Sequence, residues 1–172
     1  MKNFTNQRGL AALEVVIVAA IVAIFATAAV PKMARILDKV QLDYEMKHLY
    51  STLNLARSLG KNSVFYPVVF SGIEKQSNNV ELQIHKNNDT VAKNCYEIVR
   101  QSTSSTYYMH YLRNGVTLYF DGSSPLKIHF DNANQYSDAN SKTITLTSKF
   151  GEAYVISNSV GRFRGSYEKP KS

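Results

Sequence analysis

The chain has 172 residues, of which 44% are hydrophobic and 19% charged, a composition typical of a folded protein with one domain of ordinary size. Its formal net charge of +7 at pH 7 favours anionic partners, such as phospholipid headgroups, nucleic acid or an acidic protein surface. The single cysteine, Cys95, excludes an intramolecular disulfide, and we expect it to be a buried thiol.

The N-terminus changes abruptly from polar to apolar at position 10. Residues 1–9 carry Lys2 and Arg8 and no acid, whereas residues 10–30 are almost entirely apolar and contain one charged residue, Glu14. A helix over the second range would be about 31 Å long, which matches the hydrocarbon core of a bilayer. We predict a membrane-spanning helix whose basic N-terminal flank stays in the cytoplasm.

A secretory signal peptide is the alternative, because Ala26-Thr27-Ala28 resembles a small-residue cleavage site. Glu14 argues against it. A carboxylate within a hydrophobic segment costs about 2.5–3.5 kcal/mol and is rarely left there without a partner. We therefore expect a cation to meet Glu14.

Gly9, Leu10, Glu14 and Pro31 together resemble the class III signal of type IV pilins and pseudopilins. The resemblance implies that a prepilin peptidase cuts between Gly9 and Leu10 and methylates the new N-terminus. It also implies that Glu14 pairs with the N-terminal amine of a neighbouring subunit during assembly. The protein would then be a single-pass protein of the inner (cytoplasmic) membrane, with a periplasmic or extracytoplasmic domain, that assembles into a pilus or pseudopilus.

Helical periodicity continues beyond the apolar segment. Pro31 lacks an amide hydrogen and clashes with the preceding turn, so it either kinks the helix or ends it. Apolar residues then recur at helical spacing, at Val30, Met33, Leu37, Val40 and Tyr44, and after a shift at Leu49, Leu53 and Ala56. With Gly60 as a stop signal, we predict one long helix from about Leu10 to Leu59.

The remainder of the chain predicts an α+β, pilin-like fold, in which the second half of the helix packs on antiparallel sheet. Runs rich in β-branched and aromatic residues predict strands at Val64–Phe70, Val80–Ile84, Tyr107–Leu112, Val116–Phe120, Leu126–Phe130, Lys142–Thr147 and Glu152–Ser157. Pro67 marks the first of these as an edge or bulged strand. Residues 101–106 and 131–141 are polar and predict exposed loops.

Three short motifs are similar to the GspH/FimT branch of pseudopilins and minor pilins: Ala56-Arg57-Ser58, Phe130-Asp131 and Gly161-Arg162-Phe163-Arg164. With this resemblance the chain divides into a leader peptide (1–9), a transmembrane and filament-core helix (10–30), an amphipathic continuation (31–60), a β-rich GspH/FimT-like domain (61–165) and a basic tail (166–172).

Enzyme chemistry is not expected, and neither is a cofactor or a metal. The four histidines, His48, His85, His110 and His129, lack the spacing of a zinc site, and no nucleophile elbow or phosphate loop is present. Residues 131–138 are rich in oxygen ligands, but they depart from a calcium-loop pattern at Ala133 and lack its glycine.

The C-terminus is the candidate binding element. It carries Arg162, Arg164, Lys169 and Lys171 against a single acid, Glu168. Arginine contacts phosphate in bidentate geometry, and aromatic residues such as the interleaved Phe163 and Tyr167 stack on bases. In β geometry Arg162 and Arg164 share a face. Some FimT-like minor pilins bind DNA through this element; the alternative is a solvated basic end whose first half pairs as an edge strand.

Two functions follow from these observations. The resemblance implies that the chain would be a minor pilin or pseudopilin whose basic C-terminal element binds extracellular DNA for uptake, or a type II secretion pseudopilin that acts without DNA. In both, its partners are prepilin peptidase, other pilins and the membrane. DNA contact through so few side chains would be mostly to the backbone and strongly salt-dependent.

Overall fold

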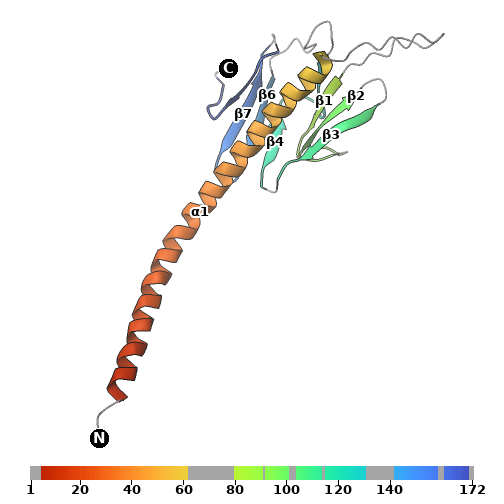
Figure 1. Ribbon diagram of the computed structural model, residues 1–172. Helices are drawn as coiled ribbons and strands as arrows, with labels where there is room; N and C mark the ends of the chain where they lie inside the picture. The colour runs from red at the N-terminus through yellow and green to blue at the C-terminus, as the bar shows by residue number, and fades with distance from the viewer. Residues whose placement is uncertain are drawn as a thin grey trace, which may run out of the picture. The chain divides into compact units, whose positions relative to one another are not determined.

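The structure, a computed structural model, describes residues 5–61, 80–90, 92–100, 104–113, 115–130, 142–158 and 161–170, with the helix side chains of residues 11–60 except Ala28. These residues form one long helix followed by strands (Figure 1). The chain divides into two compact units, residues 1–37 and residues 38–172. The first unit contributes only helix, and the second contains the rest of the helix and all the described strands.

Helix α1 (Thr5–Lys61) is longer than predicted at both ends and runs through Pro31 without interruption. The alternative in which the helix ends at Pro31 is therefore wrong. Proline removes one backbone hydrogen bond, but long helical stretches on both sides keep the surrounding turns formed. One segment of α1 is long and apolar enough to cross a membrane, and none of that segment is buried within the protein.

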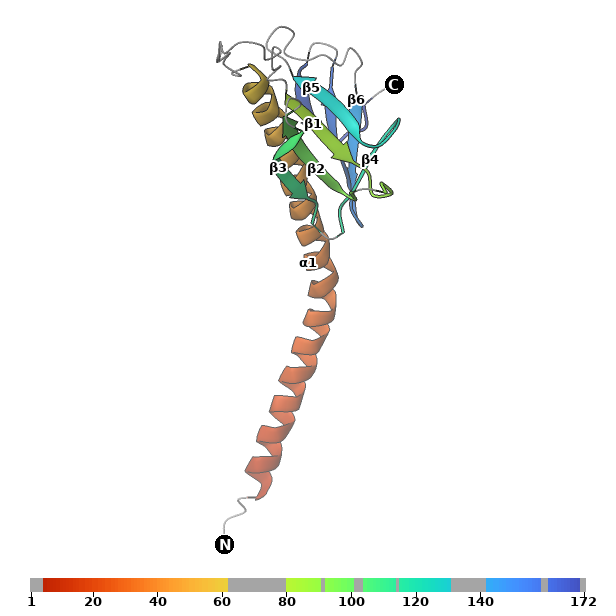
Figure 2. The same cartoon turned by 90° about the vertical axis from the view of Figure 1, so that its right-hand side faces the viewer.

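Two four-stranded antiparallel sheets follow α1 in the second unit (Figure 2). The first has the order β3-β2-β1-β5 and the second the order β4-β6-β7-β8. Their strands are β1 (Val80–His85), β2 (Cys95–Arg100), β3 (Ser105–Tyr111), β4 (Thr117–Phe120), β5 (Leu126–Phe130), β6 (Lys142–Thr147), β7 (Glu152–Ser157) and β8 (Phe163–Ser166). We call them the β1 sheet and the β6 sheet.

The predicted bounds of β5, β6 and β7 are confirmed, those of β1 and β4 differ by one residue at one terminus, and β3 begins two residues and ends one residue earlier than predicted. The sequence prediction missed β2, because Glu97 and Arg100 interrupt its apolar run. It also assigned Ser105 and Thr106 to a loop, whereas they begin β3 opposite β2. The predicted strand Val64–Phe70 and the predicted loop 131–141 lie outside the described residues.

The core is built on one stripe of α1. The buried residues of that stripe are Leu42, Met46, Leu49, Leu53 and Ala56. Leu49, Leu53 and Ala56 were expected there, but the stripe extends toward Leu42 and Met46, and the predicted apolar run from Val30 to Tyr44 is exposed. Both sheets turn their apolar side chains to the same cluster. Each buried leucine contributes about 1.5–3 kcal/mol relative to exposure.

Gly60 allows the C-terminal end of α1 to approach β5 closely. A Cβ at this position would lie 2.6 Å from Cβ of Phe130 and 2.9 Å from the Phe130 carbonyl oxygen. Real Cβ atoms are not found at such distances, and part of the obstruction is backbone. Glycine is therefore required here because there is no space for a side chain, and not because of its backbone conformation.

We predict that Gly60→Ala lowers the free energy of unfolding by about 1–3 kcal/mol, because the methyl group must displace β5. Helix propensity alone predicts the opposite sign, since alanine favours a helix by about 1 kcal/mol over glycine. The matched control is Gly151→Ala, whose Cβ would meet only Leu42 Cδ2 at 3.6 Å. Thermal unfolding followed by circular dichroism measures both, and an unchanged or raised Tm for Gly60→Ala would contradict the prediction.

Candidate functional site

The Gly161–Arg164 motif leads into β8 at the edge of the β6 sheet. Arg164 pairs with Ile156 and Phe163 pairs with Ser157 on β7. Because strand side chains alternate, Phe163 turns inward to Phe130, with ring centroids 6.2 Å apart, while Arg162 and Arg164 are both exposed. The expectation that Phe163 is available to stack on a base is wrong, because its ring belongs to the core.

A tight turn positions the motif. Gly161 has φ 74°, a left-handed conformation that favours glycine. The amide of Gly161 donates to the Asn158 carbonyl at 3.0 Å, and the amide of Arg162 donates to Asn158 Oδ1 at 2.8 Å. Arg57 Nη1 of α1 donates to the Gly161 carbonyl at 3.1 Å. The helix therefore fixes the turn from which the two arginines project.

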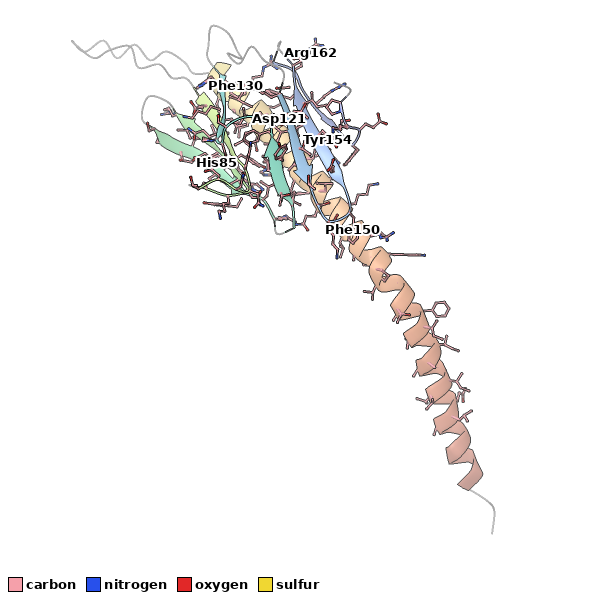
Figure 3. The ribbon with its side chains drawn as sticks, turned by 180° about the vertical axis from the view of Figure 1, so that it is seen from behind. His85, Asp121, Phe130, Phe150, Tyr154 and Arg162 are labelled. Atoms are coloured by element: carbon pink, nitrogen blue, oxygen red, sulfur yellow. The ribbon has the colours of Figure 1, made fainter. Side chains whose placement is uncertain are left out.

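The three sequence motifs thus meet in one place. Arg57 contacts Gly161, Phe130 contacts Phe163, and Gly60 lies against Phe130. Asp131, the second residue of its motif, lies outside the described residues. Figure 3 places Phe130 and Arg162 toward the same end of the domain. The motifs build a scaffold that presents Arg162 and Arg164.

The arginines are available for a ligand, as far as the described residues show. Neither guanidinium forms a hydrogen bond or ion pair within that part of the chain. Lys169 is also exposed, and Lys171 lies outside the described residues. Tyr167 is already engaged, because its hydroxyl donates to Asp43 Oδ1 on α1. Burial and this contact raise the pKa of Tyr167 to about 12.

A second polar group lies between α1 and the β1 sheet, and the sequence did not predict it. Glu45 is fully buried, and His110 Nε2 lies 2.9 Å from its Oε2. His48 stacks on His110 with centroids 4.1 Å apart, and its ring nitrogens contact the hydroxyls of Tyr96 and Tyr108. Arg113 closes the group: its amide donates to Glu45 Oε1 at 3.3 Å and its guanidinium lies over Tyr44.

From the sequence we expected only that the four histidines lack the spacing of a zinc site, and nothing there brought His48 and His110 together. The available signal is the spacing of Glu45 and His48, which are three residues apart and so share a helix face beside the apolar stripe. Burial, and to a smaller extent positive charge at His110 and Arg113, lowers the pKa of His48. The arrangement holds α1 against β3 through polar contacts.

His85 forms a third polar contact, at the end of β1. Its Nδ1 lies 2.9 Å from Asp89 Oδ2, which also accepts a hydrogen bond from Ser124 Oγ. Its buried Nε2 has no hydrogen-bond partner among the described residues, and Glu97 Oε1 lies 3.5 Å away. Within those residues no three His, Cys, Asp or Glu side chains converge as a metal site would require.

Cys95 is buried, as expected, opposite His85 in the strand pairing. Burial, with nearby Glu97 and Asp89, raises the pKa of its thiol to about 11. The raised pKa favours the protonated thiol at neutral pH, and burial shields it from solvent.

Comparison with solved structures identifies the fold. Two crystal forms of the type IV minor pilin FimU from Pseudomonas aeruginosa are similar, with TM-scores of 0.53 and 0.52 and 15% and 14% sequence identity. The matches cover 74% and 73% of this chain and 89% and 92% of FimU. No family model and no curated protein sequence matches the chain. The chain therefore has an α+β, type IV pilin-like fold.

We predict that His48 makes the domain less stable as pH falls below about 6.5. The unfolded chain binds a proton at His48 more readily than the folded chain, so this contribution is fully present above about pH 6.5 and is lost as pH falls through the lowered pKa. The dependence of Tm on pH should be shallower in His48→Gln than in the parent protein. Equal slopes in His48→Gln and the parent protein would contradict the assignment.

Proposed function

We propose that the chain is a minor pilin or pseudopilin of the GspH/FimT branch, a membrane-anchored subunit that joins a filament through α1. The observation that carries the proposal is the exposed apolar surface of α1. Large apolar side chains from Leu13 to Val40 are about half to three-quarters exposed, for example Phe25 at 71% and Ile24 at 69%. Such a surface is stable only in lipid or against other apolar surfaces.

The four N-terminal signal residues take roles in this proposal. Prepilin peptidase cuts between Gly9 and Leu10, and the new amine of one subunit meets Glu14 of its neighbour. Glu14 is exposed on α1 and so is accessible to a neighbouring chain. Its pairing with a cation offsets the cost of a carboxylate in an apolar environment. Pro31 lies within the continuous helix. Because it lacks an amide hydrogen, helix hydrogen bonding is weaker at this position when the subunits pack into a filament.

We predict that Glu14→Lys abolishes filament incorporation while leaving membrane insertion intact, because two cations would then face each other. Incorporation is measured by immunoblotting sheared filaments, and insertion by the membrane fraction resistant to carbonate extraction. Asn54→Lys, which places a lysine at an exposed position of α1, should incorporate normally. Normal incorporation of Glu14→Lys would exclude the proposed pairing.

A second function, DNA capture, is favoured by the two exposed arginines that Arg57 and the Gly161 turn hold in place. Each guanidinium can contact a phosphate, and the overall charge of +7 attracts a polyanion. Contacts of this kind position the protein on the backbone and do not read sequence. Copies clustered in a filament would raise the affinity by avidity. Without DNA binding, the same anchor and domain serve a type II secretion pseudopilus.

We predict that full-length protein in non-ionic detergent binds duplex DNA, and that Arg162→Ala with Arg164→Ala weakens binding. The slope of log affinity against log salt concentration is negative, and its magnitude should decrease by about two, because two phosphates are no longer neutralised by a guanidinium. The control is Lys93→Ala with Arg100→Ala, which removes the same charge from positions elsewhere on the domain. An equal loss of DNA affinity in both double variants would mean that binding depends on net charge alone. If the parent protein binds no DNA at low salt, the secretion alternative is favoured.

A further inference from the structure

The hairpin between β6 and β7 ends in the turn Ser148-Lys149-Phe150-Gly151, which we call the hairpin tip. The amide of Ser148 donates to the Gly151 carbonyl at 2.9 Å and closes the turn. Lys149 is exposed, and Phe150 is 46% exposed although its side chain is large and apolar. Lys149 Nζ lies 5.2 Å from the centroid of the Phe150 ring. The tip therefore presents an aromatic ring and an ammonium group side by side.

A carboxylate of α1 holds the hairpin tip in place. Asp38 Oδ2 accepts hydrogen bonds from Ser148 Oγ at 2.6 Å and from the Phe150 amide at 3.1 Å. Gly151 lies beside Leu42 of the same helix, because a Cβ built at Gly151 would be 3.6 Å from Leu42 Cδ2. These contacts fix the backbone that carries the ring. A side chain on a fixed backbone loses less conformational entropy when a partner buries it.

The position of Asp38 in the chain brings the hairpin tip close to the apolar segment. Asp38 is the first residue of the second unit, and Figure 3 shows Phe150 at the opposite end of the domain from Phe130. About 12 Å of helical rise separates Asp38 from Val30, the last residue of the apolar segment. The headgroup layer on each side of a bilayer is about 5–8 Å thick, which leaves about 4–7 Å. That gap is comparable with the length of a phenylalanine or lysine side chain.

The charges around the hairpin tip favour an anionic surface. Lys39 and Lys149 are both exposed. The acids that flank them in the sequence are already engaged: Asp38 accepts hydrogen bonds from the tip, and Glu152 accepts one from the Tyr154 hydroxyl. Aromatic and basic residues together are typical of segments in the membrane interface, where the ring enters the boundary with the acyl chains and the cation stays among the headgroups.

We propose that the hairpin tip is a second membrane contact of this protein. Phe150 enters the headgroup layer beside the α1 span, and Lys149 contacts the phosphate groups of anionic lipids. The inference rests on the proposed membrane anchoring through α1 and adds to it a contact made by the domain. Because Asp38 holds the tip on α1, this contact sets the orientation of the domain on the bilayer before the subunit joins a filament.

The chain contains no tryptophan, so a single tryptophan at the hairpin tip is a specific fluorescent probe. Full-length Phe150→Trp is reconstituted at low density in vesicles of phosphatidylcholine and phosphatidylglycerol, with and without lipids brominated near the headgroup end of the acyl chain. We expect the brominated lipid to quench about half of its emission or more. Tyr107→Trp, at an exposed position of β3, should keep its emission, and Phe25→Trp, in the apolar segment, should be quenched.

Charge reversal tests the phosphate contact. Lys149→Glu, combined with Phe150→Trp, should reduce the quenching several-fold in vesicles that contain phosphatidylglycerol. Arg100→Glu makes the same change of charge at the exposed end of β2, opposite Ser105, and should leave the quenching unchanged. Equal effects of the two reversals would overturn the role of Lys149.

The three tryptophan variants separate this proposal from the membrane anchor. If Phe25→Trp is quenched but Phe150→Trp keeps its emission as Tyr107→Trp does, the anchor stands and the hairpin contact is wrong. If Phe25→Trp is not quenched, the membrane anchor itself fails. A shift of the Phe150→Trp emission to shorter wavelength without quenching by brominated lipid would assign the ring to a contact with a neighbouring protein, and would also overturn the proposal.

Discussion

One stripe of α1, from Leu42 to Ala56, is the surface on which both sheets of the domain are packed. Everything else in the second unit depends on this burial. It sets the register of the helix against β5, where Gly60 leaves no room for a side chain, and it brings Met46 to within 3.1 Å of a Cβ built at Gly165 of β8. The two sheets have no described strand in common, and α1 packs against both.

The same constraint explains why distant motifs meet. Arg57 lies one residue beyond the last buried position of the stripe and is therefore directed at the Gly161 turn rather than into the core. Phe163 enters the core beside Phe130, and this places Arg162 and Arg164 outside. The two arginines are therefore exposed because side chains alternate in direction along the edge strand β8. The part of α1 within the second unit therefore orients these two arginines.

Local patterns predicted the helix, most strands and the fold class, because apolar periodicity and turn residues act over short distances. These local patterns failed where long-range contacts determine the conformation of a segment or the direction of a side chain. Glu97 and Arg100 hid β2, whose strand conformation comes from pairing on both sides, and Phe163 was assigned to a binding surface because only tertiary packing reveals its inward direction. The contact of Glu45, His48 and His110 joins a helix to a strand far along the chain, and the spacing of Glu45 and His48 signals only the helix side of it. Arg57 was identified through family resemblance, and its role became visible only in the fold.

Cys95 has a use that follows from its isolation. It is the single thiol of the chain, fully buried on β2 between β1 and β3. Because a thiol of raised pKa inside a sheet reacts only when the strands separate, its alkylation rate reports the opening of the β1 sheet. No engineered label is needed, and the readout works equally in a membrane or in an assembled polymer. The native chain thus carries an intrinsic probe of its own local unfolding.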